Sequence, residues 1–233
     1  MSIVTVVTGA GAGIGSEICR ILLERGETVI GCPRRPGSET LAALSGGHPD
    51  RFHEVRMDVS DDASIEQAVA EIESRVDHVD RLFNNAGFYP KKEGGLTALS
   101  RDTLGKAFQT NAIGPLKVTA ALLPLLRKGN EKRLAQITSL MGSITDNTSG
   151  RSYSYRLSKT ALNMAVKNLA HELGHEGFIA LAIHPGWVQT NMGGSMAPLP
   201  LGPASEEVLR IVLEATPDQN GAFLGPGGKV LPF

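Results

Sequence analysis

The 233-residue sequence has little cysteine, few aromatic residues and almost no net charge, and these shortages exclude several classes of protein. Its two cysteines, Cys19 and Cys32, are too few for a disulfide framework, and a chain of this length buries a core without one. The formal net charge is -1, from 23 basic and 24 acidic residues, so no overall basic surface indicates a nucleic-acid partner.

Long apolar runs are also missing from the sequence. No run approaches the ~20 residues that span a bilayer, and the first residues have no basic region followed by an apolar core, as a signal peptide would. We therefore expect a cytoplasmic protein with no membrane partner, no nucleic-acid partner and no metal site.

Hydrophobic residues make up 41% of the chain, which is enough for a buried core, and short apolar runs alternate with longer amphipathic segments. This alternation predicts an α/β fold, namely a three-layer, doubly wound parallel sheet of the Rossmann type with about seven strands and helices on both faces. No linker divides the chain, so residues 1–233 are expected to form a single domain. Strands are expected at residues 3–7, 28–30, 55–57, 81–83, 134–137, 179–183 and 222–224, and helices at about 14–25, 61–75, 102–127, 153–175 and 205–214.

A glycine-rich loop lies between the first expected strand and the first expected helix. Gly9 allows a sharp exit from the strand, Gly13 lets the backbone approach a pyrophosphate, and Gly15 lets the helix pack closely on the sheet. The start of the helix adds free N–H groups and a positive dipole end. Ser16 follows Gly15, so the lysine of a triphosphate-binding loop is absent and nucleotide hydrolysis is disfavoured.

The residues after the second expected strand indicate which dinucleotide binds. An acidic residue there would accept a hydrogen bond from a free ribose 2′-hydroxyl, but Arg34 and Arg35 occupy this region instead. Two guanidinium groups suit a 2′-phosphate, which favours NADP(H), with NAD(H) as the alternative. Asp58, after the third expected strand, is placed to accept a hydrogen bond from the adenine amino group.

Tyr155 and Lys159 lie four residues apart on one face of an expected helix. A free tyrosine has a pKa of ~10, which is too high for ready proton exchange near neutral pH. A neighbouring ammonium favours the phenolate, so we expect Lys159 to lower the pKa of Tyr155. The tyrosine could then protonate a developing alkoxide or take up a proton in the reverse direction.

Together these motifs resemble the short-chain dehydrogenase/reductase family, in its single-domain form. The residues that match, in the order of the family, are Thr8, Gly9, Gly13, Ile14, Gly15, Asp58, Val59, Asn84, Asn85, Ala86, Gly87, Asn111, Ser139, Tyr155, Lys159, Pro185 and Gly186. The resemblance implies a nicotinamide cofactor and hydride transfer between it and a carbonyl or alcohol. Residues 147–150 and 227–233 are similar to the branch that holds sniffer-like carbonyl reductases and C-factor proteins.

The resemblance also implies a role for each catalytic residue. Tyr155 matches the general acid/base, Lys159 the residue that lowers its pKa and holds the nicotinamide ribose, and Ser139 the hydroxyl that positions the substrate oxygen. Asn111 matches the helix asparagine that holds a proton-relay water. The residues implied to bind the cofactor are Gly9, Ala12, Gly13, Ile14, Gly15, Arg34, Arg35, Asp58, Val59, Asn85, Ala86, Gly87, Tyr155, Lys159, Pro185, Gly186, Val188 and Thr190.

The sequence departs from the family pattern in two places. Ser139 precedes Tyr155 by 16 residues, more than is usual, and Ser143, 12 residues before Tyr155, is a rival for its role. Ser139 is preferred because it follows the fifth expected strand directly. Gly11 and Ala12 stand where NADP-dependent members often carry an arginine, so the phosphate would depend on the Arg34 and Arg35 pair.

These features predict an NAD(P)-dependent oxidoreductase that reduces a ketone or aldehyde with NADPH, or catalyses the reverse oxidation. The alternative is a sensor or signalling protein that binds NAD(P) without catalysis. Segments 88–96, 140–153 and 187–201 are the expected pocket walls, and their low charge favours an apolar small-molecule substrate. The resemblance further implies a homo-oligomer, either a dimer or a tetramer.

Overall fold

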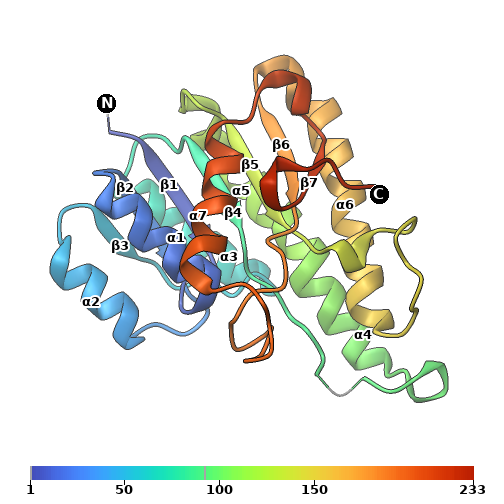
Figure 1. The fold of residues 1–233 in the computed structure, drawn as a ribbon. Coiled ribbons are helices and arrows are strands. Elements are labelled where there is room, and N and C mark those ends of the chain that lie inside the picture. Colours follow the sequence, from blue (N-terminus) through green and yellow to red (C-terminus); the bar gives the residue numbers. More distant parts are fainter. Residues whose placement is uncertain (1, 92) are drawn as a thin grey trace.

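A seven-stranded parallel sheet forms the centre of the computed structural model, which describes residues 2–91 and 93–233 (Figure 1). The strand order is β3-β2-β1-β4-β5-β6-β7, and each neighbouring pair runs parallel. The strands are β1 (Val4–Thr8), β2 (Thr28–Cys32), β3 (Phe52–Glu54), β4 (Arg81–Asn84), β5 (Arg133–Ile137), β6 (Ile179–Ile183) and β7 (Phe223–Leu224). The order reverses between β1 and β4, and ligands of such sheets bind outside the carboxyl ends of the strands at this reversal.

Helices cover both faces of the sheet and make the predicted three-layer fold (Figure 1). One face packs against α1 (Gly13–Glu24), α2 (Glu39–Gly47) and α7 (Leu201–Leu213). The other packs against α3 (Asp62–Glu73), α5 (Gly114–Lys128) and α6 (Tyr153–Leu173), and α4 (Arg101–Phe108) precedes α5 and packs on α6. The fold class predicted from the sequence is confirmed.

The local sequence explains most of these elements. All residues of β1 and β6 are buried, as expected for apolar strands with helices on both faces. In α1, Ile18, Cys19 and Leu22 form a fully buried stripe with helical spacing. Asp61 begins α3, because its carboxylate accepts hydrogen bonds from the N–H groups of Ala63 and Ser64 at 3.0 and 3.3 Å.

The prediction from the sequence misplaced one strand at the edge of the sheet and missed one helix. The third strand is β3 at residues 52–54 and not 55–57. Val55 and Met57 are buried as they leave the strand, and their N–H groups still bond to the end of β2, which explains the misleading apolar pattern. Helix α2 was not predicted, because only Leu41 and Leu44 are buried along it and its amphipathic signal is weak.

The helix predicted at 102–127 is a continuous helical stretch with a change of geometry in its middle. A π-helical segment at Gln109–Ile113 joins α4 to α5, and Asn111 is buried within it. Pro115 is the second residue of α5, directly after the π-helical segment, and Pro124 lies inside the helix. The last helix, α7, begins at Leu201 and not at 205.

None of the helices in the described part of the chain is both long and apolar enough to cross a membrane.

Candidate active site

A cavity of about 740 Å³ lies at the carboxyl ends of the central strands, where the strand order reverses. Its walls include most of the predicted cofactor-binding residues: Gly9, Ala12, Gly13, Ile14, Arg34, Arg35, Asp58, Val59, Asn85, Ala86, Gly87, Tyr155, Lys159, Pro185 and Thr190. Gly15, Gly186 and Val188 are not among the residues that line the cavity. The lining residues come from distant segments of the chain and meet in one cavity. A dinucleotide is long, so it needs contacts from several loops of this kind.

The first turn of α1 faces this cavity and suits a pyrophosphate. Ala12 precedes the helix and provides no side-chain cap, and the first turn carries no acidic residue. Its N–H groups are therefore available to an anion, and the helix dipole favours negative charge. Gly13 has a φ of +61°, and a Cβ there would lie 3.3 Å from the methyl group of Thr190 on the opposite wall.

The glycine loop is bound directly to the turn that follows β4. The hydroxyl of Thr8 accepts hydrogen bonds from the N–H groups of Asn85 and Ala86 at 3.0 and 3.1 Å. The side-chain amide of Asn85 donates in return to the carbonyl of Thr8 at 3.0 Å. A Cβ on Gly15 would collide with the carbonyl of Gly9 and with Asn85, so Gly15 serves the close packing of helix on strand that the sequence predicted.

The adenosine side of the cavity is basic. Arg34 and Arg35 are exposed in its wall directly after β2. Partial burial raises the pKa of Asp58, but hydrogen bonds from Ser60 and the charges of Arg34 and Arg56 lower it overall, so the carboxylate is ionised. One oxygen of Asp58 accepts bonds from the N–H and hydroxyl of Ser60, so Asp58 also shapes its own turn.

Tyr155 is buried in the cavity wall, in the first turn of α6, and the Ser139 hydroxyl lies beside its phenol. Burial raises the pKa of Tyr155 to about 12, although the Ser139 hydroxyl acts in the opposite direction. The Nζ atom of Lys159 lies 5.7 Å from the centre of the Tyr155 ring, and the expectation that it lowers the pKa of Tyr155 stays a prediction. Burial lowers the pKa of Lys159 itself to about 7, so the amine is only partly charged near pH 7.

The structure brings Ser139, and not Ser143, to the tyrosine. Ser139 follows β5, and its hydroxyl accepts a hydrogen bond from the N–H of Met141 at 3.1 Å and lies beside the phenol of Tyr155. The Ser143 hydroxyl accepts a bond from the N–H of Asp146 at 3.0 Å and is buried within its own loop. The geometry therefore favours Ser139 as the substrate-positioning hydroxyl.

Asn111 lies behind Tyr155 and not in the cavity wall. Its side-chain oxygen accepts a bond from the N–H of Phe88 at 2.7 Å, and its amide donates to the Phe88 carbonyl at 2.8 Å and to the Ser158 hydroxyl at 2.9 Å. Ser158 in turn donates to the carbonyl of Tyr155. Both amide protons of the Asn111 side chain are thus engaged and its oxygen accepts one bond, and its role in holding a relay water stays a prediction.

Two residues near Tyr155 were given no role from the sequence, although Tyr89 lies in the expected wall segment 88–96. The ring of Tyr89 packs edge-on against the ring of Tyr155, with centroids 4.9 Å apart and planes at 84°. Arg156 donates hydrogen bonds to the carbonyls of Met141 and Gly150, and so ties the longer loop before α6 to the helix. The spacing between Ser139 and Tyr155 signalled this extra loop but not the residue that holds it.

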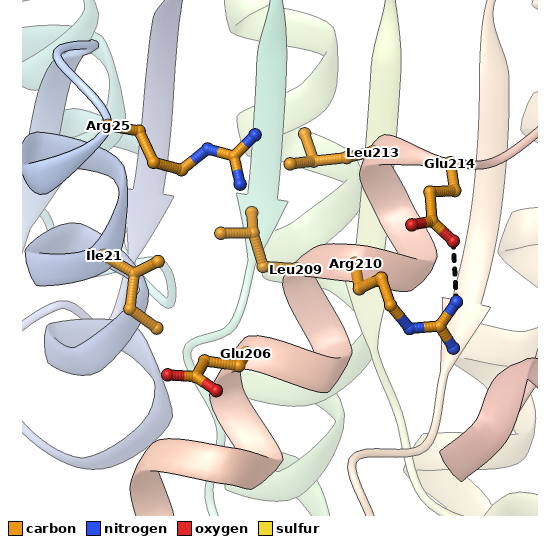
Figure 2. Close-up of a pocket in the computed structure, with 7 residues that line it drawn as sticks. All are labelled: Ile21, Arg25, Glu206, Leu209, Arg210, Leu213 and Glu214. Atoms are coloured by element: carbon orange, nitrogen blue, oxygen red, sulfur yellow. Dashed lines mark hydrogen bonds and ion pairs between the residues drawn. The ribbon is translucent and has the colours of Figure 1, made fainter.

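A smaller cavity of about 200 Å³ lies between α1 and α7, and Figure 2 shows its lining. Ile21 comes from α1, and Leu209 and Leu213 come from α7. Arg210 pairs with Glu214 at 2.6 Å along its own helix. This cavity contains none of the predicted site residues.

The doubly wound sheet, the glycine loop and the buried Tyr155–Lys159 pair in one cavity define a dinucleotide-dependent oxidoreductase of the Rossmann type. Residues 3–198 match the family model for short chain dehydrogenase, and the chain belongs to this family. It is an NAD(P)-dependent oxidoreductase that acts on CH–OH or C=O groups.

Several known proteins and solved structures are similar to this chain. The chain is 43% identical over 159 residues to the C-signal protein of Myxococcus xanthus, covering 66% of this chain and 93% of that protein. It is 34% identical over 237 aligned residues, the full length of both proteins, to a 1-hydroxy-2-glutathionyl-2-methyl-3-butene dehydrogenase of Rhodococcus sp. (strain AD45). Among solved structures, it resembles the carbonyl reductase Sniffer of D. melanogaster, at 31% identity and a TM-score of 0.93 over all of both chains. An NADPH-bound carbonyl reductase from chicken fatty liver is 29% identical, with a TM-score of 0.92 over all of both chains.

Proposed function

We propose that this protein reduces a ketone or aldehyde with NADPH and that Tyr155 supplies the proton. The observation that carries the proposal is the burial of Tyr155 and Lys159 in the wall of a cavity that also contains the glycine loop and two arginines, with the Ser139 hydroxyl beside the phenol. A carbonyl oxygen that reaches Tyr155 would meet two hydroxyl donors. Donors held in place where negative charge develops lower such barriers by several kcal/mol.

The cofactor preference rests on the charges that follow β2. Arg34 and Arg35 line the cavity, and no acidic residue stands between Cys32 and Ser38 to repel a 2′-phosphate. The carbonyl reductase from chicken fatty liver, which shares the fold, was solved with NADPH bound. Both observations support NADP(H), with NAD(H) as the weaker alternative.

The residues of the chain divide the chemistry as follows. When bound, NADPH supplies the hydride. The pKa of Tyr155 is raised to about 12, so its phenol carries a proton throughout the neutral range and can donate it to the strongly basic alkoxide that forms on the substrate oxygen. Lys159 lies nearby with a pKa of about 7 and can return a proton to the tyrosine after each turnover.

The test is the Tyr155→Phe variant, with Tyr153→Phe as the matched control on the same helix turn. Tyr155→Phe should bind NADPH with nearly wild-type affinity in a fluorescence titration, yet lose ~10²–10⁴-fold in turnover of a panel of aldehydes and ketones. Tyr153→Phe should keep its turnover. Near-normal turnover by Tyr155→Phe would overturn the assignment of the proton donor, and NADPH binding without any turnover in the wild type would favour a sensor or signalling role.

We also propose that the protein forms a homo-oligomer through the outer faces of α5 and α6. Four large apolar side chains are exposed in and beside these helices, namely Ile113, Leu116, Leu157 and Met164. Apolar groups left exposed on neighbouring helices favour a protein contact. Light scattering would give the mass directly, and a monomer at all concentrations would contradict this proposal.

A further inference from the structure

The loop after β4, described at residues 85–91 and 93–95, is fastened to the helix that carries Tyr155. Near its start, Asn111 holds the backbone of Phe88 on both its N–H and its carbonyl. Next, the ring of Tyr89 packs against the ring of Tyr155. Farther along, Glu93 bonds to Ser154, the residue directly before Tyr155. Neither Glu93 nor Ser154, which make the last of these contacts, has a role in the proposed chemistry.

Glu93 caps α6 from outside the helix. Its two carboxylate oxygens lie 3.0 and 3.2 Å from the N–H of Ser154, and one of them also accepts a bond from the Ser154 hydroxyl. Ser154 has no exposed surface. Ser152, which precedes the helix, is in the left-handed conformation with a φ of 46° and provides no side-chain cap. A first helical turn needs acceptors for its N–H groups and favours a negative charge, and Glu93 supplies both.

We propose that Glu93 is a positioning residue for Tyr155, which acts through Ser154 to hold the first turn of α6 and the loop 85–95 together. This inference rests on the proposed function. A proton donor must stay within a fraction of an ångström of its productive place, because small displacements of reacting groups cost large factors in rate. Tyr155 sits in the first turn of its helix, so the carboxylate that closes this turn also limits how far the phenol can move.

The opposite side of the same turn is held by a different residue. Arg156 bonds to the carbonyls of Met141 and Gly150 and to the hydroxyl of Ser149. The two neighbours of Tyr155 therefore each fasten a separate loop, Ser154 through Glu93 and Arg156 directly. Since Arg156 stays bound when Glu93 is changed, a Glu93 variant should loosen the turn without unfolding it.

The experiment compares Glu93→Ala, Glu93→Gln and Ser154→Ala with Glu66→Ala, an exposed glutamate on α3, as the control. Amide hydrogen exchange of the first turn of α6 is followed in each protein, together with kcat and KM for a carbonyl substrate and the Kd for NADPH. We expect Glu93→Ala to speed exchange at residues 153–157 about tenfold. We also expect kcat to fall about tenfold or more, with the NADPH Kd nearly unchanged.

Glu93→Gln keeps an acceptor oxygen but loses the charge, so it should fall between Glu93→Ala and the wild type. Adding Ser154→Ala to Glu93→Ala should bring little further loss in kcat, since residues that act through one contact are not additive. Wild-type exchange at 153–157 in Glu93→Ala would show that the contact does not hold the turn and would overturn the proposal. Faster exchange with unchanged kcat would also overturn it. If the wild-type protein turned over no carbonyl compound, the proposed function would fail, whereas the exchange result would still report on the contact itself.

Discussion

The Nζ atom of Lys159 donates a hydrogen bond of 2.8 Å to the main-chain carbonyl of Ile137, the last residue of β5. This is its one hydrogen bond to the described residues, and the amine is otherwise enclosed. Its position next to Tyr155 is therefore set by the end of a central strand. The arrangement serves the site at a cost in stability, because an ammonium group is buried without a carboxylate partner.

Replacing this amine should make the protein more stable and inactive. Burial lowers the pKa of Lys159 from 10.5 to about 7, a penalty of order 4 kcal/mol for holding the charged form. In Lys159→Met, the unpaired carbonyl of Ile137 offsets about 1–3 kcal/mol of that gain. We expect a net gain of about 1–3 kcal/mol in unfolding free energy at pH 7, measured by urea denaturation, together with loss of turnover.

The same comparison has a defined pH dependence. Between about pH 7 and pH 10 the unfolded chain holds a proton on Lys159 that the folded protein has lost, so wild-type stability rises with pH relative to Lys159→Met. The advantage of the variant should be largest below pH 7 and shrink towards pH 10. A constant difference across this range would mean that Lys159 is not buried as a titrating amine.

Removal of the two candidate serine hydroxyls should have unequal effects. Ser139→Ala removes the donor that contacts Tyr155, and we expect kcat/KM to fall ~10²–10³-fold. Ser143→Ala removes only the bond to the N–H of Asp146, which should lower stability by about 0.5–1.5 kcal/mol and leave kcat/KM close to the wild type. The opposite ranking in steady-state kinetics would make Ser143 the positioning residue.

Reversing one charge beside β2 should change the cofactor preference. Arg34→Asp places a carboxylate in the basic wall of the cavity, and we expect NADPH to bind ~10–100-fold more weakly, because a charge-assisted bond is lost and repulsion replaces it. NADH binding should hold or improve. Arg101→Asp, an exposed arginine at the start of α4, is the control. Equal affinities of the wild type for NADPH and NADH, measured by calorimetry, would refute the role of the pair.

Crowding at the glycine loop can be separated from backbone strain by two alanine variants. Gly9 and Gly26 both have positive φ, at 66° and 85°, but a Cβ on Gly9 would lie 2.8 Å from the Cα of Ala86, whereas none would be met within 4 Å at Gly26. Gly26→Ala should cost about 1 kcal/mol of stability and Gly9→Ala about 2–4 kcal/mol. Only Gly9→Ala should weaken cofactor binding, and similar losses in both variants would contradict the crowding argument.

Sequence reasoning predicted the elements whose signals are local and strong. The buried apolar runs of β1 and β6 and the helical stripe of α1 repeat at characteristic spacings, so they could be found without the fold. It failed at β3, where buried residues continue past the strand end, and at α2, where few apolar residues face the core.

In the site, too, the features with a local sequence signal were predicted and those without one were missed. The positions of Tyr155 and Lys159 on one helix face follow from their spacing, but the direction of their pKa shifts depends on burial by distant segments, which the sequence does not display. The contact of Glu93 with Ser154 joins residues 61 positions apart. No local pattern marks such a pair, because it arises only when two loops meet over the same helix.

Arg156 grips the loop before α6 mainly through main-chain carbonyls, at Met141 and Gly150. Main-chain carbonyl groups are present whatever side chains the residues between Met141 and Gly150 carry. The side chains of Thr145 and Asn147 do fix the loop, through the carbonyl of Phe233 and the N–H of Gly150. The exposed residues 144, 146 and 148 can be exchanged while both ends of the segment stay anchored. Libraries built within these three positions offer a route to new carbonyl selectivity with the proton donor left undisturbed.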